Sequence, residues 1–119
     1  MIKICIIEDN IPIRKLFSTL LKKSGFEVSD FGDGASAVDW LSANTPDIIL
    51  MDILLPDING TELLTNVRNL PGKSKIKVIA ITGFASANDK EKYLELGFNG
   101  YLPKPINTAS FVSDIQSLI

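Results

Sequence analysis

The chain has 119 residues, of which 45% are hydrophobic and 22% charged, and its formal net charge is −2. This size and composition predict one globular domain over residues 1–119, and neither the charge nor any apolar run favours direct contact with DNA or a membrane. The absence of histidine excludes imidazole metal sites and serine–histidine or cysteine–histidine catalysis, so carboxylates must carry any chemistry.

Short apolar runs rich in β-branched residues recur along the chain. They lie at residues 2–7, 48–51 and 78–81, with weaker candidates at 26–31 and 100–102. Nearly uninterrupted runs of this length are typical of parallel strands that are covered on both faces. The first run contains the only cysteine, Cys5, and lacks the features of a secretory signal, which favours a cytoplasmic location.

Helical patterns alternate with these runs. Asn10 precedes the first helical pattern and Asn59 a later one, and both are good helix-capping residues. Apolar residues with helical spacing are Ile13, Leu16, Phe17, Leu20 and Leu21, then Leu63, Val67 and Leu70, and finally Phe111, Ile115, Leu118 and Ile119. Five strands alternating with five helices predict an α/β fold, a doubly wound parallel sheet with helices on both faces.

Polar side chains follow four of the predicted strands at the point where each strand ends. They are Glu8 and Asp9, then Asp52, then Thr82, and finally Lys104. Ligands bind outside the carboxyl ends of the strands in such sheets, so we expect these side chains to converge on one cleft.

The chemistry of this set favours phosphoryl transfer. Carboxylates brought together raise one another's pKa unless a cation is present, and Mg²⁺ prefers oxygen ligands, so Asp9 and Asp52 are candidate Mg²⁺ ligands. Asp52 would be the nucleophile that accepts the phosphoryl group. Lys104 and Thr82 would contact the phosphoryl oxygens.

These motifs resemble the receiver domain of bacterial response regulators, the CheY-like family of two-component signalling. The resemblance spans the whole chain, and the segments that carry it are Glu8-Asp9-Asn10, residues 47–52 with Pro56 and Gly60, Ile81-Thr82-Gly83 and residues 101–105. It implies the flavodoxin-like (βα)5 fold with strand order 2-1-3-4-5. The phosphodonor would be a histidine on a sensor kinase or on a histidine phosphotransfer protein.

The resemblance also implies a role for individual residues at the metal. Asp9, Asp52 and the backbone carbonyl of Leu54 would bind Mg²⁺, and Glu8 would act through water. The bond between Lys104 and Pro105 is a candidate cis peptide.

By the same resemblance, Thr82 and Tyr101 are the switch residues. Thr82 would move to the acyl phosphate, and the Tyr101 ring would turn into the space it leaves. The reporting face would comprise the fourth helix, fifth strand and fifth helix, within residues 85–96, 100–102 and 107–119. A downstream protein or a second copy of the chain would bind there.

Two apolar positions distinguish this chain from many relatives, Leu54 and Phe84, which lie two residues after Asp52 and Thr82. We hypothesise that both side chains overhang the acyl phosphate and slow its hydrolysis by excluding water. The alternative is that they only pack.

Several alternatives remain open at this stage. The chain could be a free-standing regulator or a receiver excised from a longer regulator or hybrid kinase. A flavodoxin-like redox protein shares the architecture, but Glu8 and Asp9 would repel a flavin phosphate. An aspartyl-phosphate phosphatase would carry an acid at the position of Leu54. A receiver that signals without phosphorylation would not need all the side chains of the phosphorylation site, and all of them are present.

Overall fold

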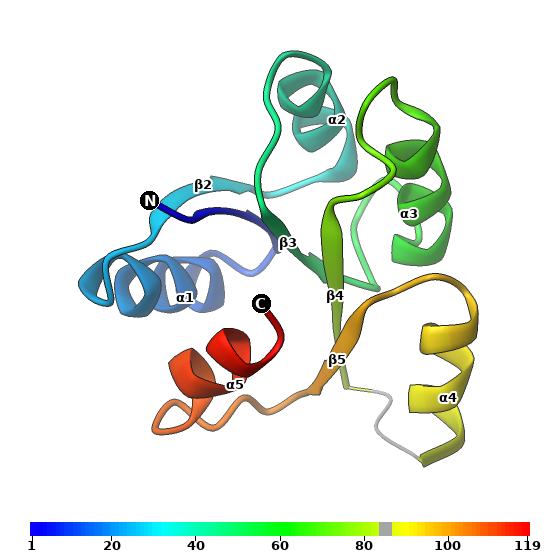
Figure 1. The fold of residues 1–119 in the computed structure, drawn as a ribbon. Coiled ribbons are helices and arrows are strands. Elements are labelled where there is room, and N and C mark those ends of the chain that lie inside the picture. Colours follow the sequence, from blue (N-terminus) through cyan, green and yellow to red (C-terminus); the bar gives the residue numbers. More distant parts are fainter. Residues whose placement is uncertain (84–86) are drawn as a thin grey trace.

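The computed structural model describes residues 1–83 and 87–119, and within them strands and helices alternate from β1 to α5 (Figure 1). The strands are β1 (Lys3–Ile7), β2 (Glu27–Phe31), β3 (Ile48–Asp52), β4 (Lys77–Thr82) and β5 (Gly100–Pro103). The helices are α1 (Ile11–Lys23), α2 (Gly34–Ala43), α3 (Gly60–Asn69), α4 (Ala87–Glu95) and α5 (Phe111–Ser117). All paired strands are parallel, in the order β2-β1-β3-β4-β5, which confirms the predicted fold.

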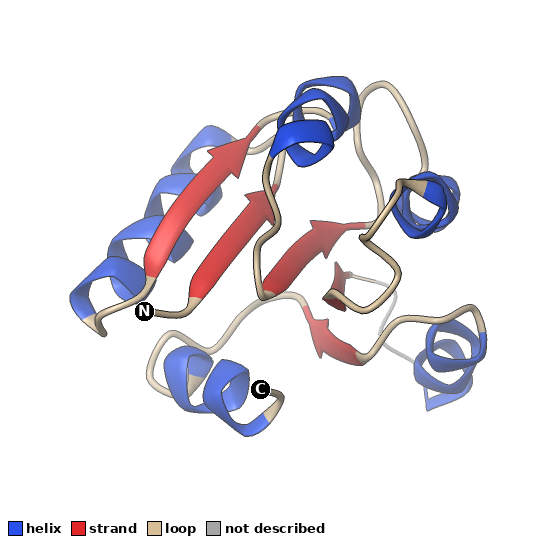
Figure 2. Cartoon of the chain, turned by 45° about the horizontal axis from the view of Figure 1, so that its top comes forward, coloured by secondary structure: helices blue, strands red, loops and turns tan. Residues whose placement is uncertain are grey.

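Helices cover both faces of the sheet. α1 and α5 lie on one face, whereas α2, α3 and α4 lie on the other (Figures 1 and 2). Within the described residues, no helix combines the length and apolarity that crossing a membrane requires.

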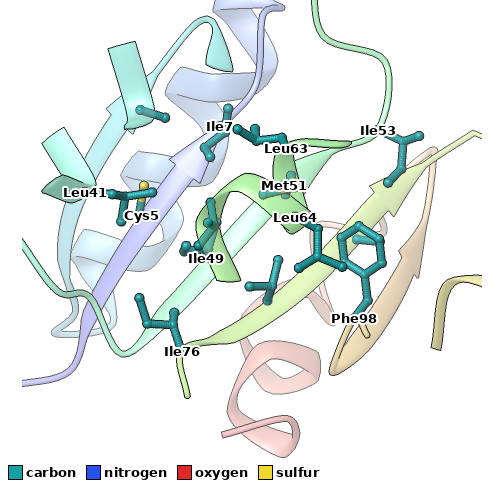
Figure 3. Packing of buried hydrophobic residues seen from close by; sticks show 14 of the residues in the cluster. Cys5, Ile7, Leu41, Ile49, Met51, Ile53, Leu63, Leu64, Ile76 and Phe98 are labelled. Atoms are coloured by element: carbon teal, nitrogen blue, oxygen red, sulfur yellow. The ribbon is translucent and has the colours of Figure 1, made fainter. Parts of the chain in front are cut away.

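The central strands are apolar throughout because successive side chains serve opposite faces. In β3, Ile49 and Met51 pack beneath α2 and α3 (Figure 3), whereas Ile48 and Leu50 pack against α1 and α5. Cys5 is part of the first of these clusters, and burial, with the negative charge of Asp30, raises the pKa of its thiol to about 12. The thiol therefore stays protonated and packs in the hydrophobic core.

The predicted helix starts are correct. The side chain of Asn10 accepts a hydrogen bond from the N–H of Ile13 (3.0 Å), and that of Asn59 accepts one from the N–H of Thr61 (2.9 Å). α5 ends at Ser117, two residues before the end of its apolar pattern. Leu118 still packs in the core, against the face that Gly100 leaves bare, so its apolar character reflects tertiary contact rather than helix.

Candidate functional site

The polar groups predicted to converge do so at the carboxyl ends of β1, β3, β4 and β5. They share a hollow of about 410 Å³, which is lined by Glu8, Asp9, Asn10, Ile13, Asp52, Leu54, Thr82, Gly83 and Lys104. Asp52 and Thr82 are the last residues of adjacent strands, and Lys104 directly follows β5. Four strand ends and the residues that directly follow them therefore build the site.

The three carboxylates form a compact cluster. One oxygen from each of Glu8, Asp9 and Asp52 lies within 4.8 Å of the others. Glu8 and Asp52 are buried, whereas Asp9 is exposed at the mouth. Oxygen atoms at this spacing, exposed to solvent on the side of Asp9, suit a hard divalent cation that keeps part of its water shell.

Lys104 is the cation that faces this cluster. Its Nζ lies 3.2 Å from Oδ2 of Asp52 and 3.2 Å from Oε2 of Glu8. Burial of the ammonium group lowers the pKa of Lys104, but the negative charges of Asp52 and Glu8 outweigh burial and leave the pKa above its ordinary value. Its backbone N–H donates to the carbonyl of Thr82 (2.8 Å), and the Lys104–Pro105 peptide bond is cis.

The raised pKa of Glu8 reflects its burial and the concentration of negative charge in the hollow. Burial raises the pKa of Glu8 to about 7. A hydrogen bond with Asp52 and the negative charge of Asp52 also raise this pKa, whereas Lys104 lowers it. One ammonium group is thus too little positive charge for these carboxylates. The donor set fits a divalent cation such as Mg²⁺.

Arg14 is a residue of the site's frame that the sequence reasoning did not identify. Its Nη1 donates to the carbonyl oxygen of Glu8 (3.1 Å), and its Nε lies 3.5 Å from Oδ1 of Asp30. A Cβ on Gly32 would lie 2.4 Å from this Nη1, so a larger residue at this position would displace the guanidinium. Arg14 therefore fixes the acidic loop after β1 against the end of β2.

The loop between β3 and α3 closes around the backbone of Asp52. The N–H of Leu54 donates to Oδ1 of Asp52 (3.2 Å), and that of Gly60 donates to the carbonyl of Ile53 (2.7 Å). A Cβ on Gly60 would meet the carbonyl oxygen of Asp52 at 2.7 Å, so α3 can begin this close only with glycine. Leu54 is one of the residues that line the hollow and is 57% exposed, whereas Phe84 lies outside the described residues.

Tyr101 is not among the described residues that line the hollow. Its half-buried ring stacks on Tyr93 of α4, with ring centroids 5.9 Å apart and an interplanar angle of 19°. Burial, followed by the charges of Asp89 and Tyr93, raises the pKa of Tyr101. Thr82 is almost fully buried at the end of β4, the strand that pairs with the strand of Tyr101.

Comparison with known proteins agrees with this geometry. The sequence model described as "Response regulator receiver domain" matches residues 4–116. The chain is 36% identical to "Polar-differentiation response regulator DivK" of Brucella anthropi over 116 residues, which cover 98% of this chain and 94% of that protein.

Solved structures show the same fold. The chemotaxis response regulator CheY4 of Vibrio cholerae superimposes with a TM-score of 0.93 at 27% identity, covering 100% of this chain and 99% of that one. The receiver domain of the sensor histidine kinase PA1611 from Pseudomonas aeruginosa, solved with a magnesium ion coordinated in its active site cleft, gives a TM-score of 0.85 at 30% identity over 98% and 95% of the two chains. The chain therefore belongs to the response regulator receiver domain family of two-component signalling.

Proposed function

We propose that Asp52 is the residue through which this receiver domain is phosphorylated. The observation that carries the proposal is the position of its carboxylate, buried beside Glu8 and within 3.2 Å of the Lys104 ammonium, at the floor of an open hollow. An anionic nucleophile held next to a fixed cation is positioned for attack on a phosphoryl group.

Mg²⁺ is the cation that we propose for this site. Asp9, Asp52 and the backbone carbonyl of Leu54 would hold it directly, and Glu8 would hold it through water. When bound, Mg²⁺ neutralises charge on the phosphoryl oxygens. The acidic cluster supports this assignment, as does the magnesium-containing receiver of PA1611.

The chain's own residues then perform the transfer. An oxygen of Asp52 forms a bond to phosphorus while the bond from phosphorus to the donor's imidazole nitrogen breaks, and the imidazole leaves. Lys104 and the Thr82 hydroxyl contact the oxygens of the resulting acyl phosphate. The protein catalyses only its own phosphorylation and dephosphorylation, and acts otherwise as a switch.

The donor would be a histidine on a sensor kinase or phosphotransfer protein, which must cover the mouth of the hollow. An apolar groove of about 450 Å³ adjoins that mouth, lined by Ile13, Leu16, Phe17, Lys104, Pro105 and Ile106. Ile13 and Lys104 line both the groove and the acidic hollow. This continuity supports docking of the donor on α1 and the segment after β5.

For the output we propose that Thr82 moves to the acyl phosphate and that the Tyr101 ring follows. The stacking of Tyr101 on Tyr93 supports this proposal, because any turn of the ring must repack α4. The face formed by α4, β5 and α5 would then bind a downstream protein or a second copy of the chain. We also propose a cytoplasmic location, since a lone buried thiol suits a reducing compartment.

A flavodoxin-like redox function is not favoured. Two of the three carboxylates in the cluster follow β1, where a flavin phosphate would need donors rather than acids.

The test is incubation with acetyl phosphate and Mg²⁺, followed by intact mass measurement. The wild-type protein should gain one phosphoryl group, and Asp52→Asn should gain none. Asp33→Asn, which changes a half-buried carboxylate outside the hollow, is the matched control and should be phosphorylated like the wild type. An adduct that persists in Asp52→Asn would refute the assignment.

A further inference from the structure

Asp57 makes a contact that the phosphorylation chemistry does not require. It lies in the loop between β3 and α3, and its two carboxylate oxygens accept hydrogen bonds from the backbone N–H groups of Gly34 and Ala35, both at 2.9 Å. These are the first two residues of α2, more than 20 positions earlier in the chain. The same bonds lower the pKa of the Asp57 carboxyl, so it is ionised at neutral pH.

The contact joins the tip of this loop to a rigid element. The first N–H groups of a helix have no partner within the helix and carry its positive end, so a carboxylate is held there by both hydrogen bonds and charge. Gly34 brings the backbone close, because a Cβ at this position would lie 2.5 Å from Cγ2 of Ile58. The side chains of Asp57 and Ile58 thus dock together on the start of α2.

Leu54 is held in place by its backbone rather than by its side chain. It is 57% exposed, and the root of its loop is held by the pairing of Leu54 with Asn59 and by the bond from Gly60 to Ile53. Only Leu55 and Pro56 separate Leu54 from Asp57. Fixing the tip at α2 therefore limits the directions that the carbonyl of Leu54 can take.

We propose that Asp57 is a positioning residue for cation binding, which holds the β3–α3 loop against α2 so that the Leu54 carbonyl faces the acidic cluster. This inference rests on the proposed function, because it needs the cation at Asp52. It assigns to α2, a helix outside the reporting face, a direct mechanical connection to the metal site.

Cation binding and the hydrogen bonds between Asp57 and α2 must affect each other reciprocally. If the bonds to α2 favour cation binding, cation binding must favour those bonds to the same degree. The amide hydrogens of Gly34 and Ala35 should therefore exchange more slowly with solvent in Mg²⁺ than in EDTA. In Asp57→Ala this difference should disappear.

The chain offers a matched control in Asp33. Its Oδ1 accepts a hydrogen bond from the N–H of Ser36 (2.7 Å), so it caps the same helix, but it belongs to the segment that leads into α2 and does not hold the loop. Asp33→Ala thus removes one carboxylate and one cap of α2 and leaves the loop tied.

The experiment is calorimetric titration of the intact chain with Mg²⁺ in wild type, Asp57→Ala and Asp33→Ala. Asp57→Ala should bind Mg²⁺ about tenfold more weakly, the low end of the range for groups that orient a metal ligand, and Asp33→Ala should bind it like the wild type. Gly34→Ala, which removes no charge and would otherwise favour helix, should also weaken binding because its Cβ displaces Ile58.

Three results separate the possible failures. Wild-type affinity in Asp57→Ala would overturn the inference, as would equal weakening in Asp33→Ala, which would reduce Asp57 to a helix cap. No Mg²⁺ binding by the wild type would instead refute the proposed function and the inference with it. If Asp57→Ala does not fold, Asp57→Asn, which keeps one acceptor oxygen, and Gly34→Ala decide the question.

Discussion

The Lys104 ammonium nitrogen lies 3.2 Å from Oδ2 of Asp52 and 3.2 Å from Oε2 of Glu8, so one cation bridges two buried carboxylates. Neither acid has another ion-pair partner among the described residues. The stability of the chain should therefore depend on Lys104, the same lysine that we propose for the chemistry. A bound divalent cation should reduce this dependence, because it also neutralises the carboxylates.

Lys104→Met should lower the free energy of unfolding in EDTA by about 1–3 kcal/mol, because it removes the ammonium group that pairs with two buried carboxylates. Mg²⁺ should restore more stability to this variant than to the wild type, since it supplies the missing positive charge. Urea unfolding in EDTA and in Mg²⁺ measures both effects. Lys15→Met, at an exposed position of α1, is the control, and equal Mg²⁺ effects in Lys104→Met and wild type would contradict the account.

The switch proposal predicts a specific signal at Tyr101. The chain has two tyrosines, so incorporation of 3-fluorotyrosine should give two ¹⁹F resonances, and Tyr101→Phe assigns them. Beryllium fluoride with Mg²⁺, which mimics the phosphoryl group, should shift the resonance of Tyr101. Thr82→Ala should abolish most of that shift while Mg²⁺ still binds. A full shift in Thr82→Ala would show that the ring responds by another route.

Leu54→Asn should shorten the lifetime of the acyl phosphate severalfold, because an amide admits water where the leucine excludes it. Phe84→Glu should act in the same direction, although that position lies outside the described residues. Decay of radiolabelled protein gives the rate. Leu96→Asn, at a leucine of comparable exposure after α4, is the control. Unchanged decay in Leu54→Asn would leave its side chain as packing only.

Leu16→Glu should impair transfer from a protein donor and spare transfer from acetyl phosphate. The substitution places a charge in the apolar groove beside the hollow, where the donor protein is proposed to dock, and leaves the acidic cluster intact. Leu94→Glu on α4 is matched in exposure, since both leucines are 42% exposed, and should not affect transfer. The measurement uses a histidine kinase or phosphotransfer protein that phosphorylates the wild type. Equal loss in both variants would argue against the groove.

The sequence was informative where local pattern and topology act together. Apolar runs that end in Glu8, Asp52 and Thr82 predict both buried parallel strands and the edge where their last residues meet, and the structure agrees. Asn10 and Asn59 were identifiable because capping depends on residues only a few positions away.

The frame of the site could not be predicted in this way. Arg14 binds the carbonyl of Glu8 and the carboxylate of Asp30, and Asp57 binds N–H groups at the start of α2. These partners are brought together by the crossover connections of the fold, so no local spacing marks them. Gly32 and Gly34 are weak indicators of these contacts, since a Cβ on Gly32 would meet Arg14 and a Cβ on Gly34 would meet Ile58, the neighbour of Asp57.

The most direct measurement of the central claim is chemical mapping of the phosphorylated residue. Borohydride reduces an aspartyl phosphate to homoserine, so treatment after reaction with acetyl phosphate and Mg²⁺, followed by peptide mass spectrometry, marks the acceptor. The account predicts homoserine at position 52 alone and none when EDTA replaces Mg²⁺. Homoserine at position 9, or modification of residue 52 that is indifferent to EDTA, would contradict it.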